Sequence, residues 1–187
     1  MNRFVKMGLS VLLALTFILP ASHVALAEEA RCRGSLGTVT VDNLRVPSYA
    51  SCRLSGTKVL GNIKVGTGAT LIANGVRVIG NIQAEGARAV TVTNSTVGGN
   101  IQLKQGGAAR IYRVRVKGDI QFESNRRALS ATYNKVGGNL QAFQNTGGVA
   151  ISYNTIDGDL QCKSNRPAPI GRGNVVYGNK EDQCRRL

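Results

Sequence analysis

Apolar and polar residues alternate in short runs along the chain, and the runs return about every 19 to 20 residues. Alternate residues of a β-strand lie on the same face of that strand. In each run the residues two before, two after and four after a repeated glycine are almost all apolar. We therefore predict one short strand per repeat, with these three positions pointing inward. The three sets are Val59, Val78, Val97, Val116, Val136, Ile156 and Val176; Ile63, Ile82, Ile101, Ile120, Leu140 and Leu160; and Val65, Ala84, Leu103, Phe122, Ala142 and Cys162.

The repeated glycine begins a tetrapeptide of the form Gly-Asn/Asp-Ile/Leu-Gln/Lys. A weaker copy surrounds Asn43, and a degenerate last copy begins at Gly178. From the first full copy to this last one, the glycines are 19, 19, 19, 20, 20 and 20 residues apart. A regular period of this size indicates a repeat architecture. The full tetrapeptides begin at Gly61, Gly80, Gly99, Gly118, Gly138 and Gly158.

Alternating segments such as 89–92 and 149–152 predict a second strand in each repeat. One strand cannot bury its apolar face alone, but repeats stacked on their neighbours share a continuous core. The sequence therefore predicts an all-β fold, a single-stranded right-handed parallel β-helix of about seven coils with 19–20 residues per coil. At about 4.8 Å per coil, the solenoid would be about 35 Å long. A left-handed hexapeptide helix would need a different coil length, and the G-G-x-G-x-D motif of calcium-binding rolls is absent.

Residues 1–27 have the features of a secretory signal peptide. Arg3 and Lys6 give a positive start, an apolar stretch follows, and Ala25-Leu26-Ala27 forms an A-x-A cleavage site. We therefore divide the chain into a signal peptide, 1–27, and a β-helix domain with disulfide-stapled ends, 28–187. The protein is expected to be exported by a bacterium and to be periplasmic or secreted, with no transmembrane segment. An uncleaved N-terminal anchor is the alternative.

The spacing of the four cysteines is an independent indication that the coils are stacked. Cys32 and Cys52 are 20 residues apart, and Cys162 and Cys184 are 22 residues apart, which is about one coil in each case. Residues one coil apart lie close enough for a disulfide, so we predict the pairs Cys32–Cys52 and Cys162–Cys184, one at each end. A redox pair or metal site is the alternative, although no C-x-x-C motif is present.

The only histidine, His23, lies in the predicted signal peptide. A mature chain without histidine excludes Ser-His-Asp and Cys-His catalysis, and it excludes zinc sites built on histidine. We therefore expect no metal and no cofactor.

Polar residues between the inward positions form outward columns. An Asn or Asp follows each glycine, a Gln lies three residues after most of them, and a Lys or Arg often lies three residues before. Stacked amides can hydrogen-bond along their own column, which is the structural interpretation. The functional interpretation is a flat, amide-rich face, edged with positive charge, that binds a polymer through its hydroxyls, carboxylates or phosphates. The candidate binding residues are Lys58, Arg77, Arg115, Lys135, Gln83, Gln102, Gln121, Gln141 and Gln161.

Two further asparagine columns are predicted to occupy turns, because Asn tolerates a left-handed backbone. Tyr133 and Tyr153 should stack one coil apart, with Tyr112 out of register by one residue. We interpret the tyrosines as packing between coils rather than as a sugar platform. The two columns are Asn125, Asn145 and Asn165, and Asn134, Asn154 and Asn174.

The formal charge of the chain is +14, and removal of Arg3 and Lys6 with the signal peptide leaves 22 basic against 10 acidic residues, or +12. A net charge of this size indicates which partners the protein could bind and carries no information about its fold. The expected partner is an anionic polysaccharide or another envelope polymer such as lipopolysaccharide. A specific nucleic-acid partner is not expected, since no nucleic-acid motif is visible. Solvated charge that protects strand edges is the alternative. The basic residues predicted to cluster are Arg110, Arg113, Arg115, Lys117, Arg126 and Arg127.

The coil length, inward aliphatic columns and Asn-rich turns of residues 38–180 resemble the pectate-lyase-type right-handed β-helix group, which includes polysaccharide lyases and hydrolases. The resemblance implies acidic catalytic residues, and the best candidates are Asp119, Asp157 and Asp159. Asn139 stands between Asp119 and Asp159 in one column, so these two look like variants of an Asn ladder. The repeats also resemble bactofilins, small β-helical proteins that polymerise end to end, although the export signal and the charged ends depart from that pattern.

We therefore expect an exported, monomeric and non-enzymatic β-solenoid that binds an anionic envelope polymer, or a partner protein, through its surface. A polysaccharide lyase or hydrolase is the alternative, and a structural scaffold is the third possibility.

Overall fold

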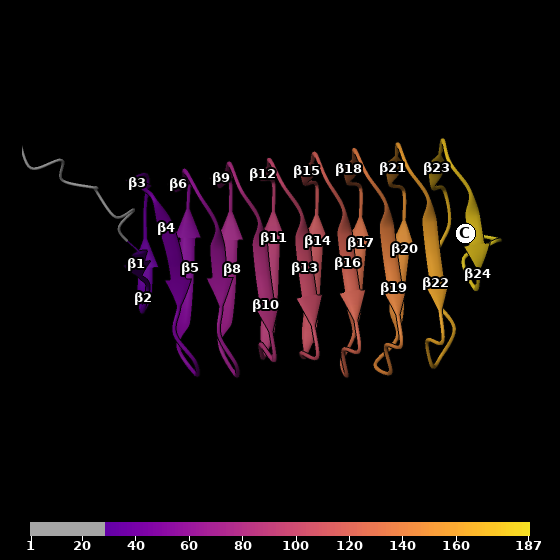
Figure 1. Ribbon diagram of the computed structural model, residues 1–187, viewed down its shortest axis with the longest axis horizontal. Coiled ribbons are helices and arrows are strands. Elements are labelled where there is room, and N and C mark those ends of the chain that lie inside the picture. Colours follow the sequence, from indigo (N-terminus) through magenta and orange to yellow (C-terminus); the bar gives the residue numbers. More distant parts are fainter. Residues whose placement is uncertain (1–28) are drawn as a thin grey trace, which may run out of the picture.

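The computed structural model describes residues 29–187 as a parallel β-solenoid of about eight turns (Figure 1). The predicted signal peptide, 1–27, and its cleavage site lie outside the described residues. The prediction of about seven coils is close to this number, and the weak copy around Asn43 forms a full turn. That copy has Asp42 in the glycine position, and Glu29 of the preceding coil stands in register where the later coils have an Asn or Asp.

The described strands form three parallel sheets, and the chain passes through sheets A, B and C in that order, except that the last turn has an isolated bridge at Ile170 in place of a sheet B strand. Sheet A contains β1 (Glu29–Arg31), β4 (Asn43–Val46), β7 (Ile63–Val65), β10 (Ile82–Glu85), β13 (Ile101–Lys104), β16 (Ile120–Glu123), β19 (Leu140–Phe143), β22 (Leu160–Lys163) and β24 (Lys180–Asp182). Sheet B contains β2 (Gly34–Leu36), β5 (Ser51–Ser55), β8 (Thr70–Asn74), β11 (Ala89–Thr93), β14 (Ala108–Tyr112), β17 (Leu129–Thr132) and β20 (Val149–Ser152). Sheet C contains β3 (Thr40–Val41), β6 (Lys58–Val59), β9 (Arg77–Val78), β12 (Thr96–Val97), β15 (Arg115–Val116), β18 (Lys135–Val136), β21 (Thr155–Ile156) and β23 (Val175–Val176).

The prediction of one strand through each glycine is wrong in one respect. The apolar residue before the glycine belongs to sheet C, as Val78 does in β9, whereas those after it belong to sheet A, as Ile82 and Ala84 do in β10. The glycine, Gly80 in this repeat, lies in the bend between the two sheets. All three apolar positions still point inward, because each sheet turns its alternate residues toward the same core.

Like residues stack in columns along the core. Ile82, Ile101 and Ile120 are register partners in three successive coils, and each has no exposed surface. Burying such a side chain contributes about 1.5–3 kcal/mol relative to leaving it in water. The repeat therefore stabilises the fold only when neighbouring coils are stacked in register.

The pairing of Gly with Asn or Asp in every repeat of the tetrapeptide has a steric cause at the corner between sheets C and A. The Oδ1 atom of Asn62 accepts a hydrogen bond from the backbone N–H of Asn81, 2.8 Å away in the next coil. To reach it, the side chain crosses Gly80, where an added Cβ would lie 2.5 Å from that oxygen. Each Asn or Asp thus requires a glycine one coil further on. The residues whose Oδ1 accepts in this way are Asn43, Asn62, Asn81, Asn100, Asp119, Asn139 and Asp159.

The other two asparagine columns are buried inside the C-terminal half of the solenoid. Asn145 donates through Nδ2 to the carbonyl oxygen of Phe122 and to Oδ1 of Asn165, and its own Oδ1 accepts from the backbone and side chain of Asn125. These asparagines are not themselves the left-handed residues that we predicted. The left-handed residue is the one before each Asn, such as Gln144 with φ 57°. No buried side-chain nitrogen or oxygen in the described part of the chain lacks a hydrogen bond.

Both predicted disulfides are present, one near each end of the described solenoid. The Cα atoms of Cys32 and Cys52 are 5.6 Å apart, and those of Cys162 and Cys184 are 5.2 Å apart. All four cysteines are buried in the core. The pairs therefore tie the first and last coils to their neighbours, where one stacking partner is missing.

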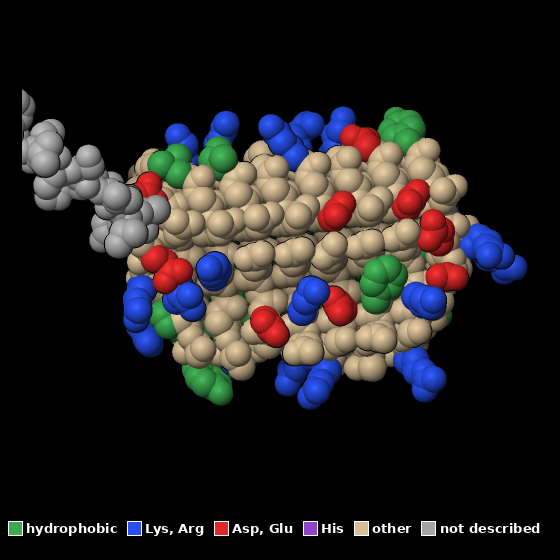
Figure 2. All heavy atoms as spheres, in the orientation of Figure 1, with side chains coloured by type: hydrophobic (Ala, Val, Ile, Leu, Met, Phe, Trp, Pro, Cys, Tyr) green, Lys and Arg blue, Asp and Glu red, His purple; other side chains and the backbone are tan. Residues whose placement is uncertain are grey.

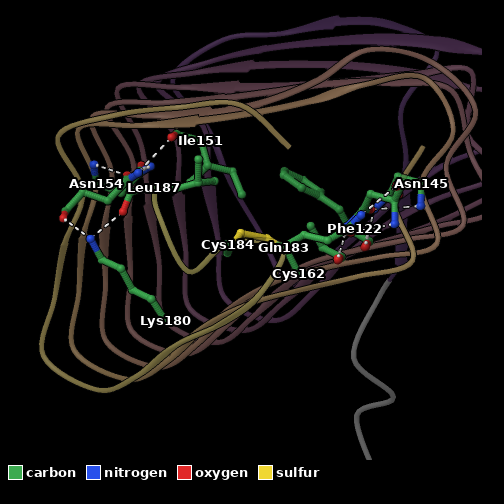
Figure 3. Close-up of a disulfide and its surroundings, with 12 residues drawn as sticks. Phe122, Asn145, Ile151, Asn154, Cys162, Lys180, Gln183, Cys184 and Leu187 are labelled. Atoms are coloured by element: carbon green, nitrogen blue, oxygen red, sulfur yellow. Dashed lines mark hydrogen bonds between the residues drawn. A yellow bond between two sulfur atoms is a disulfide. The ribbon is translucent and has the colours of Figure 1, made fainter. Parts of the chain in front are cut away.

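The C-terminal residues close the end of the solenoid (Figure 3). Gln183 ends one asparagine column, because its Oε1 accepts from the backbone and side-chain nitrogens of Asn165. Lys180 ends the other, since its Nζ donates to the carbonyl oxygens of Asn174 and Leu187. Cys162–Cys184 lies between the two columns and fastens this cap to the core.

We predict that Gly118→Ala lowers the free energy of unfolding by about 1–3 kcal/mol, because the new methyl group overlaps Oδ1 of Asn100. Urea denaturation followed by circular dichroism measures the change. Gly37→Ala is the matched control, since an added Cβ there has no heavy atom within 4 Å. Adding Asn100→Ala to Gly118→Ala should restore part of the loss, and equal stability of Gly118→Ala and wild type would contradict the steric account.

We also predict that Asn145→Ala lowers the free energy of unfolding by about 2–4 kcal/mol, because buried donors of Asn125 lose their acceptor. Asn179→Ala serves as the control, since Asn179 lies exposed at the end of the outer column, and its change should stay within about 0.5 kcal/mol. Thermal unfolding of the two variants side by side measures the difference. A similar effect of both substitutions would show that the buried column does not stabilise the solenoid.

Candidate binding surface

The five candidate glutamines form one hydrogen-bonded row along sheet A. Each Nε2 donates to Oε1 of the next glutamine, over distances that fall from 3.2 Å at Gln83–Gln102 to 2.7 Å at Gln141–Gln161. The hydrogen bonds of the row all run in one direction. Lys64, whose ammonium group can only donate, lies in register with Gln83 at one end, and Glu181 accepts a hydrogen bond from Gln161 at the other. The amides therefore satisfy much of one another's hydrogen-bonding capacity, as the structural interpretation predicted. The full row is Gln83, Gln102, Gln121, Gln141 and Gln161.

The four candidate basic residues form a second row, on sheet C. Lys58 pairs in register with Arg77, and Arg115 with Lys135, while Thr96 occupies the coil between the two pairs. All four basic side chains are exposed. The basic row and the glutamine row lie on adjoining sheets, separated by the corner that carries the Asn and Asp column. Figure 2 shows uncharged rows along the molecule and Lys and Arg side chains projecting from its upper edge, where Figure 1 places sheet C.

Ion pairs distinguish these two surfaces. In the described region the salt bridges are Arg45–Glu29 and Lys104–Glu123, each 2.8 Å long and both on sheet A. The Arg45 guanidinium donates a hydrogen bond to Glu29 and so holds the pKa of that carboxyl below its usual value. No residue of the basic row on sheet C takes part in an ion pair with another described residue. The positive charge of the row therefore remains available to an external anion.

A shallow depression adjoins the basic row at the corner between sheets B and C. It has a volume of about 380 Å³, and Arg113, Arg115, Tyr133 and Lys135 contribute to its lining. The Tyr133 and Tyr153 rings stack with centroids 4.9 Å apart, as predicted from the one-coil spacing. Their ring faces are turned toward each other, which fits the interpretation of these tyrosines as packing between coils.

The six basic residues of the predicted cluster are spread around the solenoid. Arg110 lies on β14, Arg113 in the turn after it, Arg115 on β15 and Lys117 in the bend that follows, whereas Arg126 and Arg127 lie in the turn before β17. Arg126 and Arg127 therefore lie at the opposite end of sheet B from Arg113. The prediction that Arg126 and Arg127 join the cluster is therefore wrong.

Two of the three candidate catalytic acids take part in the hydrogen bonds of the outer Asn and Asp column. Oδ1 of Asp119 accepts the backbone N–H of Asn139, and Oδ1 of Asp159 accepts that of Asn179, each at 2.7 Å. Both carboxylates thus perform the structural role that Asn performs in the other coils. Asp157 is exposed in the bend before Gly158. Among residues 29–187, no group of three or more His, Cys, Asp or Glu side chains is placed to hold a metal ion.

Comparisons of the chain with protein-family models, with curated proteins and with solved structures found no match. Within the described residues, no helix has the length and apolar character needed to cross a membrane. The two disulfides indicate an oxidising compartment. The function proposed below therefore rests on the geometry of the surfaces.

Sequence reasoning missed one group of side chains, the arrangement of arginines around Tyr112. The guanidinium carbons of Arg110 and Arg113 lie 4.8 and 5.0 Å from the centroid of the Tyr112 ring. The signal was present as Arg110-Ile111-Tyr112-Arg113, since Arg110 and Tyr112 alternate with a buried residue. What the alternation did not reveal is that the chain turns at Arg113, with φ 52°, and that its side chain reaches the same ring.

We predict that Asp119→Asn changes the free energy of unfolding by less than about 0.5 kcal/mol, because the amide retains the acceptor for the Asn139 N–H. Asp119→Ala removes the acceptor and should cost about 1–2 kcal/mol. Chemical denaturation measures both, with Asp157→Ala as the exposed control. A polysaccharide-cleaving activity that Asp119→Asn abolishes would contradict the structural assignment of this carboxylate.

Proposed function

We propose that the protein is an exported, non-enzymatic β-solenoid that binds an anionic polysaccharide, or another anionic polymer of the cell envelope, through the basic row on sheet C. The observation that carries the proposal is the row Lys58, Arg77, Arg115 and Lys135, exposed at coil spacing and without acidic partners in residues 29–187. The oxidising compartment indicated by the disulfides, together with the predicted signal peptide, supports a periplasmic or secreted location.

A polymer suits this surface better than a small molecule does. Register pairing holds neighbouring charges about 4.8 Å apart, and the row extends over several coils. An extended anionic chain that follows the solenoid axis meets these charges in succession and releases its counterions as it binds. A single small anion would engage one or two of them, and the depression beside the row is shallow.

We predict that replacing Arg115 and Lys135 together by Gln weakens retention on an immobilised acidic polysaccharide, so that the protein elutes at lower salt. The slope of log affinity against log salt should fall by up to about two, because about two fewer counterions are released. Affinity chromatography over a series of salt concentrations measures both effects.

The matched control replaces Arg126 and Arg127 by Gln, which removes the same charge from an exposed turn on the other side of sheet B. It should alter retention much less. Equal loss in the two double variants would mean that net charge, not the row, determines binding. Release of new reducing ends or unsaturated products from the polymer would overturn the non-enzymatic assignment.

A further inference from the structure

Large apolar side chains are exposed at both ends of the outer face of sheet C. The residue that follows each sheet C strand donates its backbone N–H to the inward residue of the sheet C strand one coil earlier. This column of residues begins with Leu60 and Ile79 and ends with Tyr177. Val175, on β23, continues the row that contains the basic residues. The four apolar side chains are between 44% and 72% exposed.

The fold itself does not require apolar residues in this column. In the coils between, Lys117 and Asp157 make the same backbone hydrogen bond as Leu60 and Ile79. A charged side chain is therefore accommodated there as readily as an aliphatic one. Almost half of the surface of Leu60 and Ile79 stays in water, so the free energy of burying it is still available to a partner.

Basic side chains lie between the two apolar ends of this face. None of them forms an ion pair with another described residue. Two exposed acids, Asp42 and Asp157, lie in bends at the edge of the face, so five basic residues stand against two acidic ones. Figure 2 shows hydrophobic side chains near both ends of the upper edge, and Lys and Arg side chains along it. The five basic residues are Lys58, Arg77, Arg115, Lys117 and Lys135.

We infer that the outer face of sheet C, with its corner to sheet A, docks on the surface of an anionic lipid bilayer. The Lys and Arg side chains attract the phosphate headgroups, while the apolar side chains enter the boundary between headgroups and acyl chains. A tyrosine suits that boundary, because its ring is apolar and its hydroxyl group is polar. A hydrophilic polymer would leave the apolar side chains in water, whereas a bilayer buries them.

The geometry of the solenoid places these groups where a bilayer surface can meet them together. Register pairing aligns the row from Lys58 to Val175 over six coil steps, or about 29 Å at coil spacing. The apolar column lies beside this row on the same corner. Docking uses the same basic row as the proposed function, but it does not depend on polysaccharide binding.

The test measures sedimentation of the mature protein with vesicles of phosphatidylglycerol and phosphatidylcholine in equal parts. Vesicles of phosphatidylcholine alone should bind much less protein, because they do not attract the basic row. Leu60→Ser with Ile79→Ser should weaken binding to the anionic vesicles about tenfold, since less apolar surface is buried. Tyr49→Ser with Ile170→Ser is the matched control, because it removes exposed apolar side chains from outside this face. It should bind like wild type.

A second measurement uses the absence of tryptophan from the chain. Tyr177→Trp introduces a single fluorescent reporter on the docking face, and its emission should shift to the blue when anionic vesicles are added, because the indole leaves water. Tyr49→Trp places the same reporter at the corner between sheets A and B, where the emission should not change. Thermal unfolding of each variant establishes that it is folded.

Failure of the wild-type protein to bind the anionic vesicles would overturn the docking. Equal binding to both kinds of vesicle, undiminished binding of the Leu60→Ser, Ile79→Ser variant, or equal blue shifts of the two tryptophan reporters would also overturn it. Retention on acidic polysaccharide separates the docking from the proposed function, and the Leu60→Ser, Ile79→Ser variant should keep that retention. Vesicle binding without retention would support the docking and contradict the proposed function, and retention without vesicle binding would do the reverse.

Discussion

The side chain of Asn or Asp at the corner between sheets C and A reaches across the backbone of the next coil, and this contact sets the geometry of the whole solenoid. Its oxygen accepts a backbone N–H at 2.7–2.9 Å, and the glycine beneath it leaves the space that the side chain needs. A shift of register by one residue would place a larger residue under most of these Asn and Asp side chains and would turn the apolar residues outward. Steric and hydrophobic requirements therefore select the same register.

One consequence of that register is that each face of the molecule acquires a uniform chemistry. On sheet A the polar groups largely satisfy one another, through the glutamine row that runs from Lys64 to Glu181 and through the Lys104–Glu123 pair. On sheet C and the adjoining corner, stacking instead aligns like charges that lack ion-pair partners among residues 29–187. The basic row on sheet C is therefore a better candidate for binding an external anion than the glutamine row on sheet A, although both form columns in the sequence.

The sequence was sufficient to predict the stacked coils, the inward columns and both disulfides, because all of them depend on a fixed number of residues per turn. It was not sufficient to place the corners. Val78 and Ile82 alternate as if in one strand, and the bend at Gly80 becomes visible only from the position of Asn62 in the preceding coil. Arg126 and Arg127 were grouped with Arg113 and Arg115 because the sequence alone did not show where the chain crosses sheet B. The Tyr112 arrangement depends on the direction taken by Arg113 after the turn, which no periodicity encodes.

The account depends most on the claim that residues one period apart lie in straight rows at coil spacing. Pulsed electron paramagnetic resonance tests it, with spin labels on cysteines introduced at position 58 and, in separate variants, at 115, 135 and 155, since the native cysteines of the described chain are all paired. These positions are three, four and five coils from Lys58 in one column. The distances should rise by about 4.8 Å per coil, near 14, 19 and 24 Å. Distances that fail to rise evenly along the series would contradict the stacking and the surfaces built on it.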